Sequence, residues 1–218
     1  QNNEDKDFCV SNFKKIIKEE KQVLLGIRDV PLDNSSIGDG AKQSEPSIKQ
    51  IFISWGANIK SRAEFEVKLY VIRKRIENLI RSSKIKQKSF FYIPSISSGT
   101  IIYKGLLMPH QLKNYFLDLL NINVKSALAL VHSRYSTNTF PTWDLAQPFR
   151  YLAHNGEINT LRGNINWMKT RESLFESEIF GKDINKISPV IVPFSSDSAS
   201  LDNALELLVL AGRSLPHA

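Results

Sequence analysis

The stretch YLAHNGEINTLRGN, from Tyr151 to Asn164, changes character abruptly near its centre. Its first three residues are an apolar run typical of a β-strand, and the triplet His154-Asn155-Gly156 that follows is poor at continuing one. Asn and Gly together suit a tight turn, because both tolerate unusual backbone angles. The same pair offers a side-chain amide and an unobstructed main-chain N–H, which are the donors that an oxyanion hole needs. The stretch by itself leaves both interpretations open.

On both sides of this stretch, the apolar periodicity predicts strands alternating with helices. Strands are expected over 48–55, 126–136, 150–154 and 188–194, and a hairpin is expected over 89–107. Helices are expected over 11–25 with Ser11 as a cap, over 61–81, over 161–175 and from Asp197 or Ser198 onward, with a short helix or turn over 109–119 and mostly loop over 26–47. Strands clustered between flanking helices indicate an α+β fold, with sheets covered by helices.

The composition indicates a globular protein of one large or two small domains, because 218 residues with 42% apolar residues can bury a sizeable core. No apolar run approaches the ~20 residues of a membrane span, so no membrane partner is expected. The first ten residues are polar and acidic, show no signal or transit peptide and lack an initiator Met, which predicts a processed chain or a fragment. The single cysteine, Cys9, excludes an intrachain disulfide and favours a reducing compartment.

The net charge of +7 is concentrated in the segment Arg73–Lys88, which holds seven Lys or Arg residues and one Glu. A basic groove for nucleic acid is one interpretation. The other is the solvated face of a helix, because Phe65, Leu69 and Ile72 recur at helical spacing and leave the opposite face to the charges. The helical interpretation is preferred, and no nucleic-acid partner is expected.

Three polar clusters each follow a predicted strand: HSRYST with Arg134, HNG with Asn155 and Gly156, and SSDS with Asp197. An Arg side chain holds a carboxylate through two parallel hydrogen bonds, and an Asp can hold an ammonium group. With an oxyanion hole between them, the clusters would bind an α-amino acid by both charged ends and polarise its side-chain carbonyl. Taken singly, the three are more often a surface ion pair, a turn and a helix cap, so a site and scattered loop residues are about equally supported.

In their order along the chain, HSRYST, HNGEIN and SSDS resemble the glutamine amidotransferases that have an N-terminal cysteine nucleophile. The longer runs VHSRYSTNTFPTWDLAQPFRYLAHNGEINTLRGNINWM and GRSLPHA resemble the glutaminase domain of the glutamate synthase family, over nearly the whole chain. The resemblance implies a four-layer αββα sandwich of two antiparallel sheets between helix layers. It also implies that residues 1–218 are a partial type-2 amidotransferase domain, truncated at both ends.

The resemblance also implies roles for individual residues. Arg134 would hold the α-carboxylate of L-glutamine, with help from Thr137, and Asp197 would hold its α-ammonium group. The side chain of Asn155 and the N–H of Gly156 would form the oxyanion hole. His132 and His154 would be structural, because the α-amino group of the nucleophile acts as the base in this family.

The nucleophile is the large departure from the family pattern. The chain starts with Gln1, and Cys9 is neither terminal nor in the family's sequence context. The nucleophilic cysteine is therefore expected outside this chain, and the fragment alone is predicted to be inactive.

In a complete enzyme of this family, the ammonia would pass to a synthase domain that converts 2-oxoglutarate to glutamate, an oxidoreductase reaction on a CH–NH2 donor. That domain would carry FMN and a 3Fe–4S cluster, and FAD is a third candidate cofactor; none is expected in this chain. The abundance of Ile, Lys and Asn, which have AT-rich codons, favours a plastid (chloroplast stroma) enzyme that uses reduced ferredoxin. The alternatives are a cytoplasmic, NADPH-dependent bacterial enzyme and a glutamine-binding module without a nucleophile.

Overall fold

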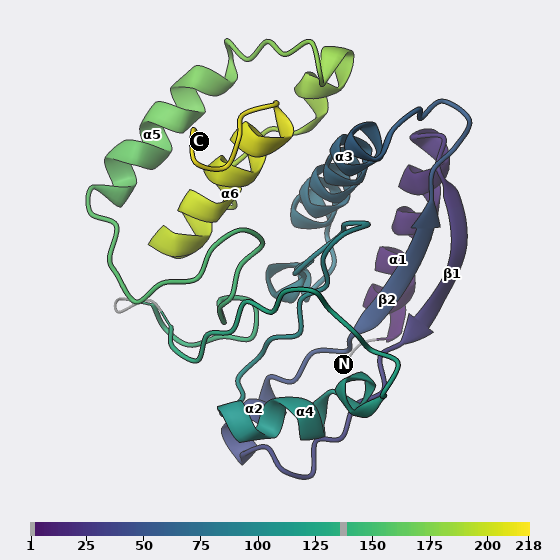
Figure 1. Cartoon of the computed structure of the whole chain (residues 1–218), viewed down its shortest axis with the longest axis vertical. Coiled ribbons are helices and arrows are strands. Elements are labelled where there is room, and N and C mark those ends of the chain that lie inside the picture. The colour runs from purple at the N-terminus through teal and green to yellow at the C-terminus, as the bar shows by residue number, and fades with distance from the viewer. Residues whose placement is uncertain (1–2, 136–138) are drawn as a thin grey trace.

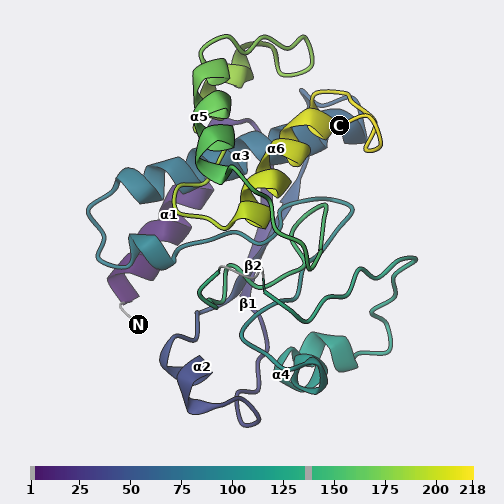
Figure 2. The same cartoon turned by 90° about the vertical axis from the view of Figure 1, so that its left-hand side faces the viewer.

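A computed structural model describes residues 3–135 and 139–218 of the chain (Figure 1). Strands β1 (Val23–Asp29) and β2 (Lys49–Ser54) form an antiparallel sheet at one side of the molecule. Helix α1 (Asn3–Glu19) contacts both β1 and the central helix α3 (Arg62–Ser82). On the other side of α3 lie α6 (Asp197–Leu210) and, beyond it, α5 (Leu161–Glu172), as Figures 1 and 2 show.

The sheet pairs Val23 with Ser54 at one end and Asp29 with Lys49 at the other. This confirms the strand predicted over 48–55. The helix predicted over 11–25 was wrong at both ends, because α1 begins at Asn3 and residues 23–25 belong to β1. Lys21, at a φ of 59°, has a left-handed backbone conformation. It lies in the turn between α1 and β1, the strand that pairs with β2.

Helix α3 confirms the prediction over 61–81, and its start is fixed by a side-chain cap. The hydroxyl of Ser61 accepts a hydrogen bond from the N–H of Glu64, with a distance of 3.2 Å. The expectation that the basic residues of this helix lie on a solvated face was wrong for Arg73 and Lys74, which are buried. Arg73 is instead paired with Glu77, at 3.1 Å, and with Glu206 of α6. Burial by itself would raise the pKa of Glu77, but the positive charge of Arg73 lowers this pKa to about 2.

Three groups of buried apolar side chains form the core. The first joins α1, α3 and the sheet, and contains Phe13, Ile16, Ile17, Ile72, Ile76, Ile80 and Ile93. The second joins α3, α6 and the segment before α6, and contains Val67, Tyr70, Val71, Phe180, Ile187, Val190, Ile191 and Leu207. The third lies near α2 (Asp39–Gln43) and α4 (Leu112–Tyr115), and contains Ile37, Tyr115, Phe116 and Trp143.

The remaining helical predictions are confirmed with shifted ends. Helix α5 stops at Glu172, and the short helix or turn expected over 109–119 is α4 with two flanking 3-10 turns, Pro109–Gln111 and Leu117–Leu120. Two further 3-10 segments are Lys88–Phe90 and Gly181–Lys186. Helix α6 begins at Asp197, and the cap is Ser196, whose hydroxyl accepts from the N–H of Ala199 at 3.2 Å.

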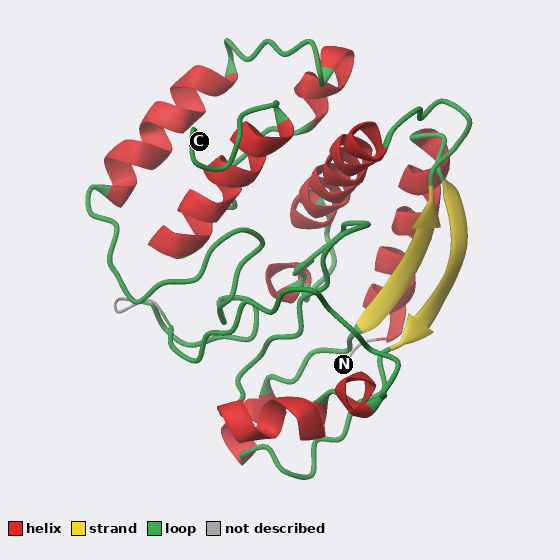
Figure 3. Cartoon of the chain, in the orientation of Figure 1, coloured by secondary structure: helices red, strands yellow, loops and turns green. Residues whose placement is uncertain are grey.

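The strands predicted over 126–136, 150–154 and 188–194, and the hairpin over 89–107, do not form among the described residues, which are loops there except where the 3-10 segment Lys88–Phe90 enters the hairpin range (Figure 3). Helix side chains take the N–H groups that a neighbouring strand would otherwise bind. Glu172 accepts from the N–H of Val190 at 2.8 Å, and Asn203 accepts from that of Val192 at 2.9 Å. Residues 126–131 instead lie at the surface, with Leu128 83% exposed.

The mixture of helices and antiparallel sheet agrees with the predicted α+β class. The sheet found in residues 3–135 and 139–218 has two strands, so the four-layer sandwich of two sheets stays a prediction. Within the same ranges, no helix combines the length and the apolar character needed to cross a membrane.

Candidate functional site

The candidate site surrounds the first turn of α6, where the chain between residues 147 and 158 approaches the helix (Figures 1 and 2). Asp197 is the first residue of α6 and is partly buried. Its Oδ2 accepts a hydrogen bond from the N–H of Ile158 at 2.8 Å, and its Oδ1 accepts from the N–H of Ser198 at 2.7 Å. The carboxylate predicted to hold an ammonium group therefore lies against the segment that carries Asn155 and Gly156.

A second contact with α6 holds the beginning of this segment. The N–H of Tyr151 donates to Oδ1 of Asp202 at 2.8 Å, and the Asp202 side chain is fully buried. Arg150 places its guanidinium 3.6 Å from Oδ2 of Asp202 and donates to the carbonyl of Ile93 at 2.6 Å. Burial raises the pKa of Asp202, and Arg150 counteracts that rise. The segment that carries Asn155 and Gly156 is therefore held at its beginning by contacts of Arg150 and Tyr151 with the buried carboxylate of Asp202.

Asn155 and Gly156 are both exposed, and neither has the left-handed backbone that a tight Asn-Gly turn would use. The N–H of Gly156 donates to Nδ1 of His154, with a distance of 3.1 Å. Because Nδ1 accepts this bond, the proton of a neutral His154 ring belongs on Nε2, which is buried and has no hydrogen-bond partner among the described residues. The His154 ring thus holds one of the two predicted oxyanion donors in this structure, and the oxyanion hole itself stays a prediction.

Arg134 lies on a separate exposed loop, where its own N–H donates to Nδ1 of His132 at 3.0 Å. The neighbouring Tyr135 donates its hydroxyl to the carbonyl of Thr142 at 3.1 Å. Thr137 lies outside the described residues. The structure therefore links the third predicted cluster to Ile158, two residues beyond the second, and the hydrogen bond of Arg134 among the described residues is to His132 of its own cluster.

The sequence did not single out Gln147, which contacts the main chain of His154 through both ends of its amide. A signal was present, since Gln147 is a polar residue between Ala146 and the pair Pro148-Phe149. A buried amide in such surroundings needs hydrogen-bond partners. The sequence could not show that the hydrogen-bond partner of Gln147 is the main chain of His154.

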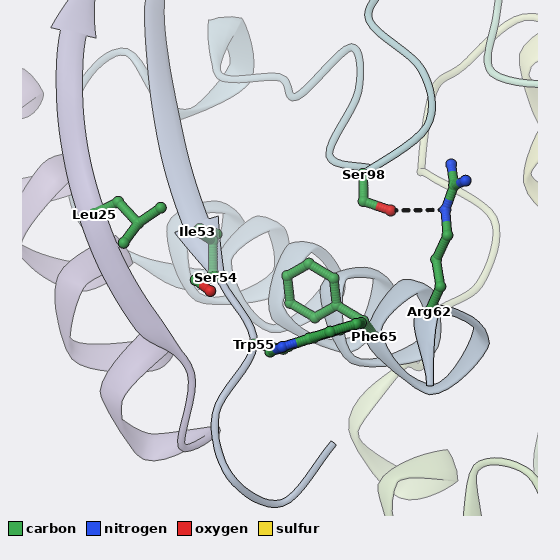
Figure 4. Close-up of a pocket in the computed structure, with 7 residues that line it drawn as sticks. All are labelled: Leu25, Ile53, Ser54, Trp55, Arg62, Phe65 and Ser98. Atoms are coloured by element: carbon green, nitrogen blue, oxygen red, sulfur yellow. Dashed lines mark hydrogen bonds between the residues drawn. The ribbon is translucent and has the colours of Figure 1, made fainter. Parts of the chain in front are cut away.

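The structure also has a pocket of about 390 Å³ between the sheet and the start of α3 (Figure 4). The ring of Trp55 meets that of Phe65 edge to face, 5.8 Å apart, and Arg62 donates to the hydroxyl of Ser98 at 3.1 Å. A second pocket, of about 340 Å³, lies on α5. The predicted site residues line neither of these two pockets.

Groups of His, Cys, Asp or Glu that could hold a metal ion are absent from residues 3–135 and 139–218. Cys9 is partly buried, and burial raises the pKa of its thiol to about 11, with a contribution from Asp5. A thiol with such a pKa is almost wholly protonated at neutral pH and is a poor nucleophile. This agrees with the expectation that the nucleophile is not Cys9.

Comparison with known proteins identifies the family of the chain. The model of the class-II glutamine amidotransferase family matches residues 1–218. The chain is 49% identical to the glutamate synthase [NADPH] large chain of Bacillus subtilis, 46% identical to the glutamate synthase [NADH] of Saccharomyces cerevisiae, and 41% identical to the ferredoxin-dependent glutamate synthase of Antithamnion sp.. These alignments cover 100%, 96% and 98% of this chain, but only 14%, 10% and 14% of the respective relatives. The chain therefore belongs to the class-II glutamine amidotransferases.

Proposed function

We propose that this chain is part of the glutaminase domain of a glutamate synthase, in which L-glutamine is hydrolysed to glutamate and ammonia. The observation that carries the proposal is the hydrogen bond between Asp197 and the N–H of Ile158. It supports a site shared by the carboxylate at the start of α6 and the Asn155-Gly156 pair, because Ile158 is two residues beyond Gly156 and 39 residues from Asp197 in the chain. Similarity to glutamate synthases over nearly the whole chain supports the same assignment.

In the proposed site, Arg134 and Thr137 bind the α-carboxylate of glutamine and Asp197 binds its α-ammonium group. The side chain of Asn155 and the N–H of Gly156 receive the oxyanion, for which the His154 ring must release the Gly156 N–H. The domain would complete the four-layer αββα sandwich with segments outside residues 1–218.

The nucleophile in this proposal is an N-terminal cysteine supplied by a part of the polypeptide outside this chain. Its sulfur bonds to the carboxamide carbon of glutamine while the carbonyl electron pair moves onto the oxygen, where Asn155 and Gly156 stabilise it. The carbon–nitrogen bond then breaks, and the nitrogen leaves as ammonia with the proton that the α-amino group took from the thiol. Water next attacks the thioester, releasing glutamate and restoring the thiol.

For the whole protein, we propose that the ammonia passes to a synthase domain with FMN and a 3Fe–4S cluster, where 2-oxoglutarate becomes glutamate. Cys9 is the single cysteine of the chain and cannot ligate such a cluster, so this chain does not hold it. We favour reduced ferredoxin as electron donor and the plastid as location. Relatives named for NADPH, NADH and ferredoxin all match, so an assay of the purified protein with each donor decides between them.

The test is the variant Asn155→Ala in the complete polypeptide. Loss of one oxyanion donor is expected to lower glutamine-dependent turnover by about 10²–10³-fold, while glutamate formation from added ammonium is retained. Asn166→Ala, on the exposed face of α5, is the matched control and should leave both activities unchanged. Equal losses of the glutamine- and ammonium-dependent activities would show that Asn155 does not act in glutamine hydrolysis.

A further inference from the structure

The side chain of Gln147 closes on the main chain of His154 with two hydrogen bonds. Its Nε2 donates to the carbonyl of His154 at 3.1 Å, and its Oε1 accepts from the N–H of His154 at 2.9 Å. A primary amide carries a donor and an acceptor side by side, so it satisfies both main-chain groups of one residue, as a neighbouring strand would. Gln147 is only 6% exposed, so little water competes for these bonds.

Along the segment 151–158, this pair of bonds lies between two other attachments. The others are the Tyr151 N–H bond to Asp202 and the Ile158 N–H bond to Asp197, both of which come from α6. The Gln147 bonds come from the chain just before the segment, where the N–H of Phe149 also donates to the carbonyl of Leu152 at 3.0 Å. The residue held in the middle is the one that directly precedes Asn155 and Gly156.

We propose that Gln147 is a positioning residue for glutamine hydrolysis, which fixes the main chain at His154 and thereby aims the oxyanion donors of Asn155 and Gly156. This inference rests on the proposed function. Oxyanion donors must lie within hydrogen-bonding distance of the developing charge, and a misplacement of about 1 Å costs on the order of 10²-fold in rate. The Gln147 amide does not alter the charges of Asp197 and Arg134, the proposed partners of the two ends of glutamine. Binding of glutamine should therefore change little when Gln147 is replaced.

In the complete polypeptide, Gln147→Met keeps the volume of the side chain and removes both hydrogen bonds. It is expected to lower kcat for glutamine hydrolysis by about 10- to 10²-fold and to change KM for glutamine by less than about 3-fold. Gln111→Met is the matched control. Gln111 is 5% exposed and likewise accepts from a main-chain N–H, of Met108 at 2.8 Å, and donates to a main-chain carbonyl, of Ser36 at 2.5 Å. Its loss should lower stability to a similar degree and leave kcat unchanged.

Gln147→Glu gives a second readout that does not depend on the folding of the Met variant. A neutral glutamic acid has a donor and an acceptor, as the amide has, whereas the ionised carboxylate has acceptors alone and faces the carbonyl of His154. The rate of this variant relative to wild type should therefore rise as the pH falls through the pKa of the new carboxyl, which burial raises above its ordinary ~4.3. Arg150, Asp197, Asp202 and His154 are present in both proteins, so the ratio isolates position 147.

The inference is overturned if Gln147→Met folds and retains the wild-type kcat for glutamine hydrolysis, or if its kcat falls no further than that of Gln111→Met. It is also overturned if the rate of Gln147→Glu relative to wild type does not change with pH. These results are distinguishable from failure of the proposed function. If Asn155→Ala lowers glutamine-dependent turnover and Gln147→Met does not, only the positioning role is wrong. If Asn155→Ala leaves that turnover intact, the proposed site itself is wrong.

Discussion

Lys74 lies within the protein on α3, where its side chain is 1% exposed. Its Nζ donates to the carbonyl of Val190 at 3.0 Å, and the carboxylate of Glu77 lies 3.9 Å away. Burial lowers the pKa of Lys74 from its ordinary 10.5 to about 7, against the opposing attraction of Glu77. We predict that Lys74→Met changes the pH dependence of folding stability.

The sign follows from the direction of the pKa change. Between pH 7 and 10.5 the unfolded chain holds a proton on Lys74 that the folded chain does not, so the free energy of unfolding of the wild type rises with pH across this window. At about 1.4 kcal/mol for each pH unit, the gap between the two pKa values corresponds to on the order of 5 kcal/mol. Above pH 10.5, Lys74→Met loses the hydrogen bond to Val190, which costs about 1–2 kcal/mol. Below pH 7 the variant should instead be more stable than the wild type by roughly 3 kcal/mol, because it has no buried ammonium group.

Urea unfolding of wild type and variant from pH 6 to pH 10.5 measures this difference directly, and taking the difference cancels the titration of groups common to both. Lys113→Met, at an exposed position of α4, is the control and should run parallel to the wild type. A Lys74→Met curve that also runs parallel to the wild type would refute the reasoning, because it would mean that Lys74 keeps its proton in the folded protein at alkaline pH.

The remaining predictions concern the proposed glutamine site and the core. Asp197→Asn keeps the shape of the side chain but removes its charge, so kcat/KM for glutamine should fall by about 10- to 10²-fold while ammonium-dependent synthesis is retained; steady-state assays with both nitrogen donors check this. Arg134→Lys loses the bidentate fork and should raise KM for glutamine about 10-fold, and a parallel loss of ammonium-dependent synthesis would contradict the assignment. Ile76→Ala opens a cavity in the fully buried core and should lower the free energy of unfolding by about 2–5 kcal/mol, whereas the same change at the exposed Ile122 should cost less than about 0.5 kcal/mol.

The helices could be predicted because their signals are local. Ser61, three residues before Glu64, is a complete capping signal within one turn, and the spacing of Phe65 and Leu69 gives the buried side of α3. Strand predictions depend on a distant partner, which periodicity does not identify. The segment around Val190 is apolar enough for a strand, but Glu172 binds its N–H instead.

The site shows the same division between local and distant information. The place of Asp197 at the start of α6 followed from the local sequence SSDS. Its bond to Ile158, and that of Asp202 to Tyr151, join residues 39 and 51 positions apart, and no local pattern announces them. Likewise the burial of Arg73 could not be foreseen from α3 alone, because Glu206, one of its two partners, is on α6.

The exposed segment 126–131 has a consequence for the behaviour of the chain when it is produced by itself. Its sequence, SALALV, is apolar and uncharged and contains no proline, and its side chains at Leu128 and Val131 are 83% and 77% exposed. Short segments of this composition, when accessible, are where separate molecules align as cross-β strands. The isolated 218-residue chain is therefore expected to self-associate increasingly with concentration, through a segment that directly precedes the cluster of Arg134.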